Sequence, residues 1–198
     1  FRHRGYEFDV GLHYIGDCGP GGVIPSVLAG VGLGDRIEYA AMDQDGFDTL
    51  VVTDLEFRVP AGWEAYRERL AAAAPDDEAE ITECLRILEE VAQQSQMASI
   101  PGAETPTLDE WGLRSLDDRF VETGLSPRAR TLVDHWAGLY GSGPGDLSVS
   151  MHAAIINHNM RGAFYPDGGG QVLPASLVEV VEALGGEVRT LAREERNG

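Results

Sequence analysis

The sequence predicts an α+β fold in which a mixed β-sheet region carries an inserted helical cap. Two patterns lead to this prediction. Residues 76–96 repeat apolar side chains at helical spacing. Near the start, apolar side chains alternate as in a strand with one buried face: Tyr6, Phe8, Val10, Leu12 and Tyr14. Because the helical part lies between strand-like parts, we expect it to be an insertion.

The strand-like segments come first along the chain. We expect one strand over residues 6–15, ended by the glycine-rich turn 16–22, and a short helix within 25–33. Residues 48–52 and 55–59 are β-branched apolar runs separated by two polar residues, which predicts a hairpin.

The central helices are predicted from spacing and capping residues. Residues 63–74 and 76–96 form two of them, and the second buries one stripe: Ile81, Cys84, Leu85, Leu88 and Val91. A capping box over Thr107–Glu110 opens a third. Ser126 followed by Pro127 opens a fourth, which we expect to run to about Tyr140.

The last part returns towards the sheet. We expect a helix over 147–160, an irregular segment over 164–170 and a short strand over 187–190. Between them a helix starts at Gln171 and has one buried side, made of Leu173, Leu177, Val180, Val181 and Leu184.

Three parts follow from these elements. Residues 1–59 are the strands and hairpin, 60–145 are the helical cap, and 146–198 are the return segment towards the sheet.

Composition excludes several classes of function. The 198 residues carry a formal charge of -18, and all 15 cationic side chains are arginines, which opposes binding to nucleic acid or to an anionic membrane. We find no run of about 20 apolar residues and no secretory signal. Cys18 and Cys84 are expected to be free thiols of a cytoplasmic protein. The chain begins without Met, so we expect an internal piece of a longer protein.

Residues 150–170 are the richest in chemical groups, with histidine, asparagine, arginine and tyrosine side chains before the glycines 168–170. Glycines let backbone approach a flat ligand closely, and a helix start offers free N–H groups. The alternative is a tight turn that feeds a helix. His152 and His158 are six residues apart and point to different faces of one helix, so we expect no metal site.

A smaller polar cluster lies on the first strand. Asp9 and His13 share one face and Tyr14 lies on the other, and this polar face is either functional or only solvated. Other motifs are absent. Residues 30–35 fail the dinucleotide fingerprint at their sixth position, and neither a nucleophile elbow nor a phosphate loop occurs.

Two segments resemble a known family. Residues 8–16, Phe-Asp-Val-Gly-Leu-His-Tyr-Ile-Gly, are similar to a segment near the start of the substrate region in retinol saturases and bacterial phytoene-desaturase-like proteins. Residues 150–158, followed by Gly-Ala-Phe-Tyr-Pro at 162–166 and the glycines, resemble a second family segment. Residues 184–190 resemble the return into the flavin domain. The resemblance therefore implies that 1–59 belong to the substrate region and that 146–198 are the return segment into the flavin-binding domain.

The resemblance implies a two-lobed oxidoreductase in which FAD transfers hydride to or from carbon–carbon double bonds of an apolar polyene, either a carotenoid or a retinoid. It also implies peripheral membrane contact of the parent protein. The dinucleotide fingerprint and the family's C-terminal flavin-binding stretch are missing, so most FAD contacts are expected on a separate flavin-binding domain. Position 167 is Asp where relatives usually have a basic residue.

The resemblance also implies site residues. His13 and His158 are the candidate catalytic residues, because either imidazole could exchange the proton that accompanies hydride transfer, or could only bind backbone. Tyr14, Tyr165, Gly168, Gly169 and Gly170 are expected near the substrate or flavin. The alternative function is a non-catalytic lobe, or a module that binds an apolar ligand or a partner without flavin. A metal hydrolase would need three convergent ligands, for which the sequence has no spacing.

Overall fold

The structure is a computed structural model that describes residues 2–8, 11, 13–52 and 54–190. Its fold is α+β, as predicted, with many helices and small antiparallel sheets. The elements in chain order are β1 (Arg2–His3), β2 (Tyr6–Glu7), β3 (Ile15–Gly16), α1 (Val23–Gly30), β4 (Tyr39–Ala41), β5 (Asp48–Val52), β6 (Leu55–Val59), α2 (Trp63–Ala73), η1 (Pro75–Asp77), α3 (Glu78–Met97), α4 (Pro106–Trp111), α5 (Leu116–Thr123), α6 (Pro127–Val133), α7 (Ala137–Tyr140), α8 (Val149–Met160), β7 (Ala163–Pro166) and α9 (Val172–Ala183).

The chain divides into two compact units. The strand unit comprises Phe1–Ala41 and Phe164–Gly198, and the helical unit is Met42–Ala163. The helical unit is therefore an insertion in the sequence of the strand unit, as expected. Its bounds are wider than 60–145 because the hairpin and α8 pack with the helices. The roles predicted for 1–59, 60–145 and 146–198 stay predictions.

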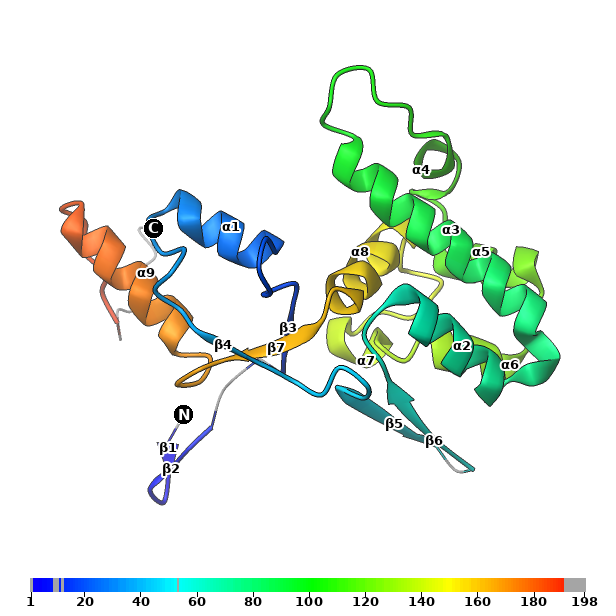
Figure 1. Cartoon of the computed structure of the whole chain (residues 1–198), viewed down its shortest axis with the longest axis horizontal. Coiled ribbons are helices and arrows are strands. Elements are labelled where there is room, and N and C mark those ends of the chain that lie inside the picture. The colour runs from blue at the N-terminus through cyan, green and yellow to red at the C-terminus, as the bar shows by residue number, and fades with distance from the viewer. Residues whose placement is uncertain (1, 9–10, 12, 53, 191–198) are drawn as a thin grey trace, which may run out of the picture. The chain divides into compact units, whose positions relative to one another are not determined.

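Helix α3 is the centre of the helical unit. It packs against α2, α4, α5 and α8, and Figure 1 shows it in green as a long helix beside α2 and α5. The predicted stripe is confirmed, since each of its members is fully buried: Ile81, Cys84, Leu85, Leu88 and Val91. Burying one large aliphatic side chain contributes about 1.5–3 kcal/mol, so this stripe is a main source of the unit's stability.

The predicted hairpin is also confirmed. Strands β5 and β6 pair antiparallel, from Asp48 opposite Val59 to Val52 opposite Leu55. On β6, Phe57 and Val59 are buried, and the Phe57 ring meets the Tyr66 ring of α2 edge-on at 6.3 Å. The hairpin is therefore held to the helices by one apolar face.

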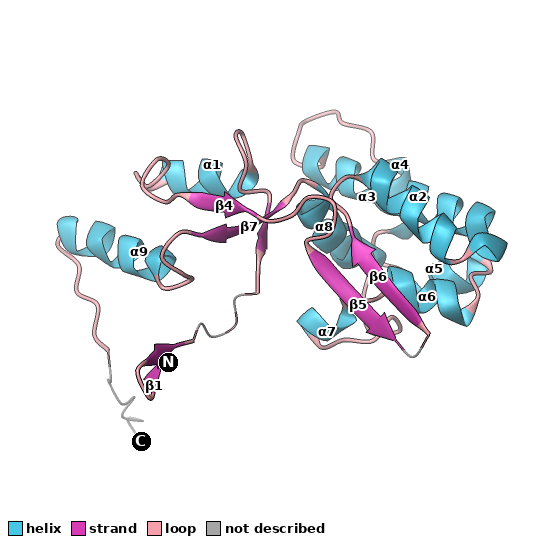
Figure 2. Ribbon diagram, turned by 60° about the horizontal axis from the view of Figure 1, so that its bottom comes forward, coloured by secondary structure: helices cyan, strands magenta, loops and turns pink. Residues whose placement is uncertain are grey.

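The strand unit has a three-stranded sheet with the order β3-β7-β4. Strands β4 and β7 are antiparallel, with Tyr39 opposite Pro166 and Ala40 opposite Tyr165, and Figure 2 shows them side by side. Helices α1 and α9 share a small apolar cluster with the sheet. Its members are Leu28, Leu33 and Ile37, with Ile24, Tyr39, Val172, Leu173 and Val180 packed against them.

Helix α9 starts where it was predicted, but its predicted buried side is only partly covered. Leu173 and Val180 pack against the cluster, whereas Leu177 and Val181 are about 40% exposed and Leu184 is 84% exposed. The strand unit is too thin to cover the whole apolar stripe of this helix.

The single strand predicted over residues 6–15 is wrong. Of its described residues, only Tyr6–Glu7 and Ile15–Gly16 are strands. β2 pairs locally with β1 through a turn in which Arg4 and Gly5 have positive φ, and Gly11 leaves the extended conformation at φ +81°. The alternating Val10 and Leu12, and also Asp9, lie outside the described residues.

The capping box predicted at Thr107–Glu110 is wrong as well. Pro106 takes the first helical position, so α4 begins earlier, and the Thr107 hydroxyl instead donates to Glu90 of α3 at 3.0 Å. A capping box does form at α5, between Ser115 and Asp118.

The helix predicted from Ser126 to Tyr140 is divided. Ser126 caps α6 as predicted, but α6 ends at Val133 and α7 is a separate short helix. At this break, His135 Nδ1 lies 2.8 Å from the Leu132 carbonyl, in the last turn of α6.

Two predictions near the end of the chain depended on strand partners. Residues 163–166, expected in part to be irregular, form β7 because β4 pairs with them. Residues 187–190, expected to be a strand, are not one; Arg189 pairs instead with Glu187 at 2.8 Å. A strand needs a neighbour to complete its hydrogen bonds, and the local sequence does not reveal whether one is present.

Candidate functional site

The glycine turn, residues 167–170, joins strand β7 to helix α9. The Asp167 amide donates to the Glu38 carbonyl at 2.9 Å, and the Gly169 amide donates to the Pro166 carbonyl at 3.0 Å. The Val172 amide then donates to the Gly169 carbonyl at 3.1 Å as α9 begins. These backbone hydrogen bonds, one of them to the distant Glu38, therefore fix a tight turn between the strand and the helix.

Two positions of this turn require glycine. Gly168 has φ +90° and Gly169 has φ +86°, a region that side chains disfavour. A Cβ at Gly168 would also lie 2.8 Å from Val172 Cγ2. The tight turn feeding a helix, one of the two interpretations of this segment, is confirmed, and contact with a flat ligand stays a prediction.

A second turn of the same kind follows the neighbouring strand β3. Residues 17–22 lead into α1, with Asp17 at φ +54° and Gly21 at φ +73°. A Cβ at Gly19 would lie 3.3 Å from the Phe164 ring of β7, so this turn closely approaches β7. From the sequence, these glycines are predicted only to end a strand. The short helix predicted directly after them is the signal that indicates a strand–turn–helix unit.

The structure places most of the predicted site residues around these turns. His13, which is exposed, and Tyr14, which is partly buried, directly precede β3, the neighbour of β7. Tyr165 lies on β7 opposite Ala40, and Gly168, Gly169 and Gly170 follow it in the turn. These residues therefore lie on, directly before or directly after β3 and β7, which are neighbours in the sheet of the strand unit.

His158 belongs to the other unit. It lies on α8 of the helical unit and is partly buried. His152, on the same helix, is completely buried. Its Nδ1 atom lies 2.8 Å from the Tyr140 hydroxyl oxygen. The described residues contain no group of three His, Cys, Asp or Glu side chains placed to hold a metal.

Two neutral polar groups lie beside the turns. Burial, followed by the charge of Asp17, raises the pKa of the Cys18 thiol to about 11, so Cys18 is not an activated nucleophile. The Tyr39 hydroxyl is buried without a hydrogen-bond partner among the described residues, and burial raises its pKa.

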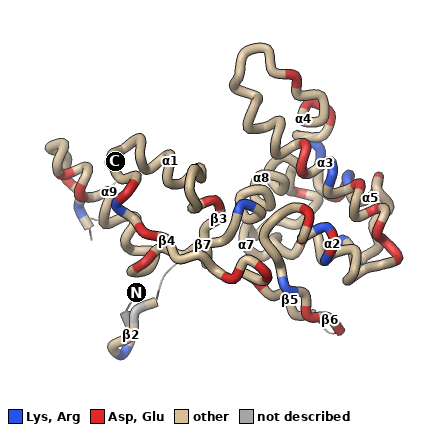
Figure 3. The backbone as a smooth tube through the Cα atoms, in the orientation of Figure 1, with Lys and Arg blue, Asp and Glu red and all other residues tan. Residues whose placement is uncertain are grey.

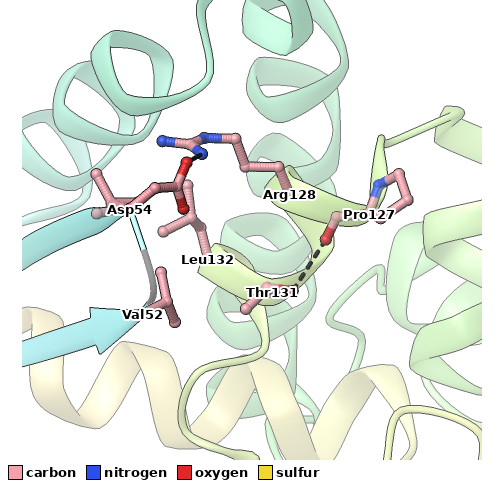
Figure 4. A pocket seen from close by; sticks show the side chains of 7 residues that line it. Val52, Asp54, Pro127, Arg128, Thr131 and Leu132 are labelled. Atoms are coloured by element: carbon pink, nitrogen blue, oxygen red, sulfur yellow. Dashed lines mark hydrogen bonds and ion pairs between the residues drawn. The ribbon is translucent and has the colours of Figure 1, made fainter.

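A pocket of about 380 Å³ lies in the helical unit, between the hairpin and α6. Figure 4 shows Arg128 reaching across to Asp54, at 2.7 Å. Arg128 Nε also donates to the Ala73 carbonyl at 3.1 Å. Because these polar groups bind each other and the backbone, they hold the hairpin to α6 and leave little to orient a ligand. The lining residues are Val52, Asp54, Leu55, Pro127, Arg128, Thr131 and Leu132.

Charge does not single out one face as a site. Acidic side chains are spread over both units in Figure 3, and arginines of the helical unit pair with them, as Arg86 does with Glu83 and Glu90. None of the helices in the described part of the chain has the length and apolar character needed to cross a bilayer.

Comparisons with known proteins identify the relatives of this chain. No family model matches it. The all-trans-retinol 13,14-reductase of Danio rerio is 28% identical over 208 residues, which cover 95% of this chain and 34% of that protein. The Homo sapiens protein of the same name is 28% identical over 97% of this chain and 34% of its own length.

The chain is retinol saturase-like. The resemblance inferred from the two sequence segments is thereby confirmed. The chain spans about a third of the length of these curated relatives. A further Danio rerio relative, named inactive all-trans-retinol 13,14-reductase, is 22% identical over the whole of this chain and 36% of its own length.

Proposed function

We propose that this chain is the substrate-side region of a flavin-dependent oxidoreductase that acts on carbon–carbon double bonds of an apolar polyene. The observation that most supports this is the match to retinol reductases over 95% of the chain. The proposed substrate is retinoid-like or carotenoid-like. The proposed parent has two lobes, with most FAD contacts on a separate flavin-binding domain.

The glycine turn is the part of this chain suited to a flat ring. Its backbone carries no side chain at Gly168, Gly169 and Gly170, and the N-terminus of the twelve-residue helix α9 follows directly. Bare backbone permits close approach, and the helix start favours an electron-rich edge. We propose that these residues hold one side of the flavin or of the substrate end beside it.

Bound flavin would supply the hydride acceptor or donor. This chain's own residues would orient the polyene and exclude water. Tyr165 on β7 and Tyr14 before β3 offer aromatic surface for that purpose.

Saturating a double bond requires a proton as well as a hydride. His13 or His158 would deliver it in this proposal, because an imidazole changes charge near neutral pH. The alternative role, a hydrogen bond to backbone alone, predicts a different result. Changing a proton donor to Gln should remove one limb of the pH–rate profile, whereas changing a structural histidine should leave the profile's shape intact.

The test uses the polypeptide of family length that carries this region, purified with FAD and supplied with all-trans-retinol or its saturated product. Tyr165→Ala should slow the change in flavin absorbance by roughly 100-fold, the loss expected when reacting groups are misplaced by about 1 Å. Tyr6→Ala, which alters an exposed tyrosine of the same unit, is the matched control. Equal rates in both variants would remove Tyr165 from the site.

A second candidate function is a non-catalytic lobe that binds an apolar ligand or a partner domain. It is favoured by the relative named as inactive and by apolar side chains exposed on the strand unit, such as Val27 of α1 and Leu184 after α9. A visible spectrum of the purified chain separates the two. A stoichiometric flavin favours a redox site within this chain, and a colourless, self-associating protein favours the lobe.

A further inference from the structure

The helical unit contains a line of three titratable side chains that the proposed redox function does not use. Asp134 follows α6, Tyr140 ends α7 and His152 lies on α8. The Tyr140 hydroxyl is 2.8 Å from His152 Nδ1 and 3.5 Å from Asp134 Oδ1. One hydroxyl therefore connects a half-buried carboxyl group to a completely buried imidazole.

The direction of this line is not fixed by the positions of the atoms. The Tyr140 hydroxyl has one hydrogen and can donate it to only one of its two neighbours at a time. It can receive a hydrogen from the other neighbour, either from His152 Nδ1–H or from a protonated Asp134. Two complete arrangements exist, and they run in opposite directions.

We propose that Asp134, Tyr140 and His152 form a reversible hydrogen-bond relay whose direction is set by the protonation of Asp134. With Asp134 ionised, His152 Nδ1–H donates to Tyr140, and Tyr140 donates to the carboxylate. With Asp134 protonated, its carboxyl donates to Tyr140, and Tyr140 donates to His152 Nδ1, whose ring proton is then on Nε2. The change takes up one proton in total and leaves the imidazole neutral.

Burial supports both states. It raises the pKa of Asp134 to about 6, so the carboxyl group changes state close to neutral pH. Burial lowers the pKa of His152 to about 3, so the ring stays neutral. A neutral imidazole carries its proton on either Nδ1 or Nε2. Nε2 has no hydrogen-bond partner among the described residues, although the Val133 carbonyl also acts on the ring and raises its pKa. The 2.8 Å contact between Nδ1 and the Tyr140 hydroxyl is therefore the contact through which Asp134 can influence the tautomer.

The other titratable groups around the relay do not compete with it. Burial raises the pKa of Tyr66 on α2 well above its usual value and that of Cys84 on α3 to about 11. Burial lowers the pKa of His135 to about 4, and the carboxyl group of Asp48 on β5 raises it by a smaller amount. Tyr66, Cys84 and His135 therefore keep one protonation state between about pH 5 and pH 7.5.

The proposed tautomer change takes place on α8, the helix that carries His152. This helix carries His158 and continues through Gly162 into β7. The relay itself does not depend on the redox function, since its three members lie within the helical unit.

Nitrogen NMR of the histidine-labelled chain tests the relay, because the two neutral tautomers have different ¹⁵N shifts. The His152 signal, assigned with His152→Gln, should change from the Nδ1–H form at pH 7.5 to the Nε2–H form at pH 5, with a midpoint at about 6. His135 is an internal reference. Its Nδ1 faces the Leu132 carbonyl, which can only accept, so its tautomer should stay constant.

Three variants complete the test. Asp134→Asn should abolish the pH dependence of the His152 tautomer. Tyr140→Phe removes the hydroxyl that joins the two residues, so the His152 tautomer should no longer respond to the protonation of Asp134. Asp146→Asn, which alters an exposed carboxylate of the same unit, should leave the midpoint unchanged. A constant tautomer in the unaltered chain, or a transition that persists in Asp134→Asn, would overturn the relay. If the variants do not fold, the pH dependence of the His152 tautomer in the unaltered chain is sufficient to test the relay.

Discussion

The Met42 amide donates a hydrogen bond to the Ala163 carbonyl at 3.0 Å, so the two ends of the helical unit meet. The Gln44 side chain reinforces this junction by donating to the Met42 carbonyl at 2.7 Å and to the Ala163 carbonyl at 3.3 Å. A segment whose ends meet and whose core lies within it has the anatomy of an independent domain.

We therefore expect residues 42–163 to fold when expressed alone. Circular dichroism should show a helical protein with one cooperative thermal transition. The matched control is 60–145, the cap as bounded from the sequence, which loses the hairpin and α8. It should not unfold cooperatively, because α3 loses the partner helix α8. Two equally cooperative fragments would contradict the insertion described here.

The buried stripe of α3 should dominate the stability of the helical unit. Leu88 is completely buried, so Leu88→Ala should lower the free energy of unfolding by about 2–5 kcal/mol. Leu113 is 97% exposed, and Leu113→Ala should change it by less than about 0.5 kcal/mol. Urea denaturation of 42–163 measures both values, and similar losses in the two variants would refute this account of the core.

Acid should destabilise the helical unit through its two buried histidines. The folded-state pKa is about 4 for His135 and about 3 for His152, below the value of about 6.5 expected in the unfolded chain. The unfolded state therefore binds more protons below pH 6.5, and stability falls as the pH falls.

Asp134 opposes this loss. Its pKa is raised to about 6 in the folded state, so the folded state binds the extra proton there and stability rises as the pH falls through 6. With Asp134→Asn, only the two histidine contributions remain, and the loss between pH 6.5 and pH 5 should be steeper. Denaturation midpoints across this range check the slopes. A variant with the same slope as the unaltered chain would show that Asp134 titrates normally.

The glycine turn should tolerate no side chain at position 168. Gly168→Ala places a Cβ at positive φ and 2.8 Å from Val172, which costs about 1 kcal/mol or more. Gly30→Ala in α1 meets no atom within 4 Å and should be neutral or slightly stabilising. Amide hydrogen exchange of Val172–Ala183 should become faster in the first variant only. Unchanged exchange in both would mean that the turn can relax around a methyl group.

The strongest sequence predictions were those that depended on local patterns. The stripe from Ile81 to Val91 needed only helical periodicity, and the hairpin over 48–59 needed only two β-branched runs and a short turn. Both are confirmed. The cap at Ser126 followed from the residue type and the proline after it. The motif resemblance was specific enough to identify retinol saturase-like relatives.

The predictions that failed needed information from distant residues. Strand β7 exists because β4, more than a hundred residues earlier, pairs with it, and residues 187–190 lack such a partner in the described structure. The helix break after Val133 coincides with a contact between the His135 ring and the Leu132 carbonyl, which helical periodicity does not reveal. For the site, the sequence predicted the tight turn at the glycines, whereas the second turn beside it became visible only when β3 was found next to β7.

The sequence by itself indicated the resemblance to retinol saturases, the α+β class and the positions of the long amphipathic helices, because these depend on residue identity and periodicity along a short stretch of chain. The tertiary structure alone decided where the helical unit begins and ends, and which polar side chains meet in its interior. Strand pairing and the alignment of Asp134, Tyr140 and His152 arise from contacts between segments whose separation in sequence carries no local signal.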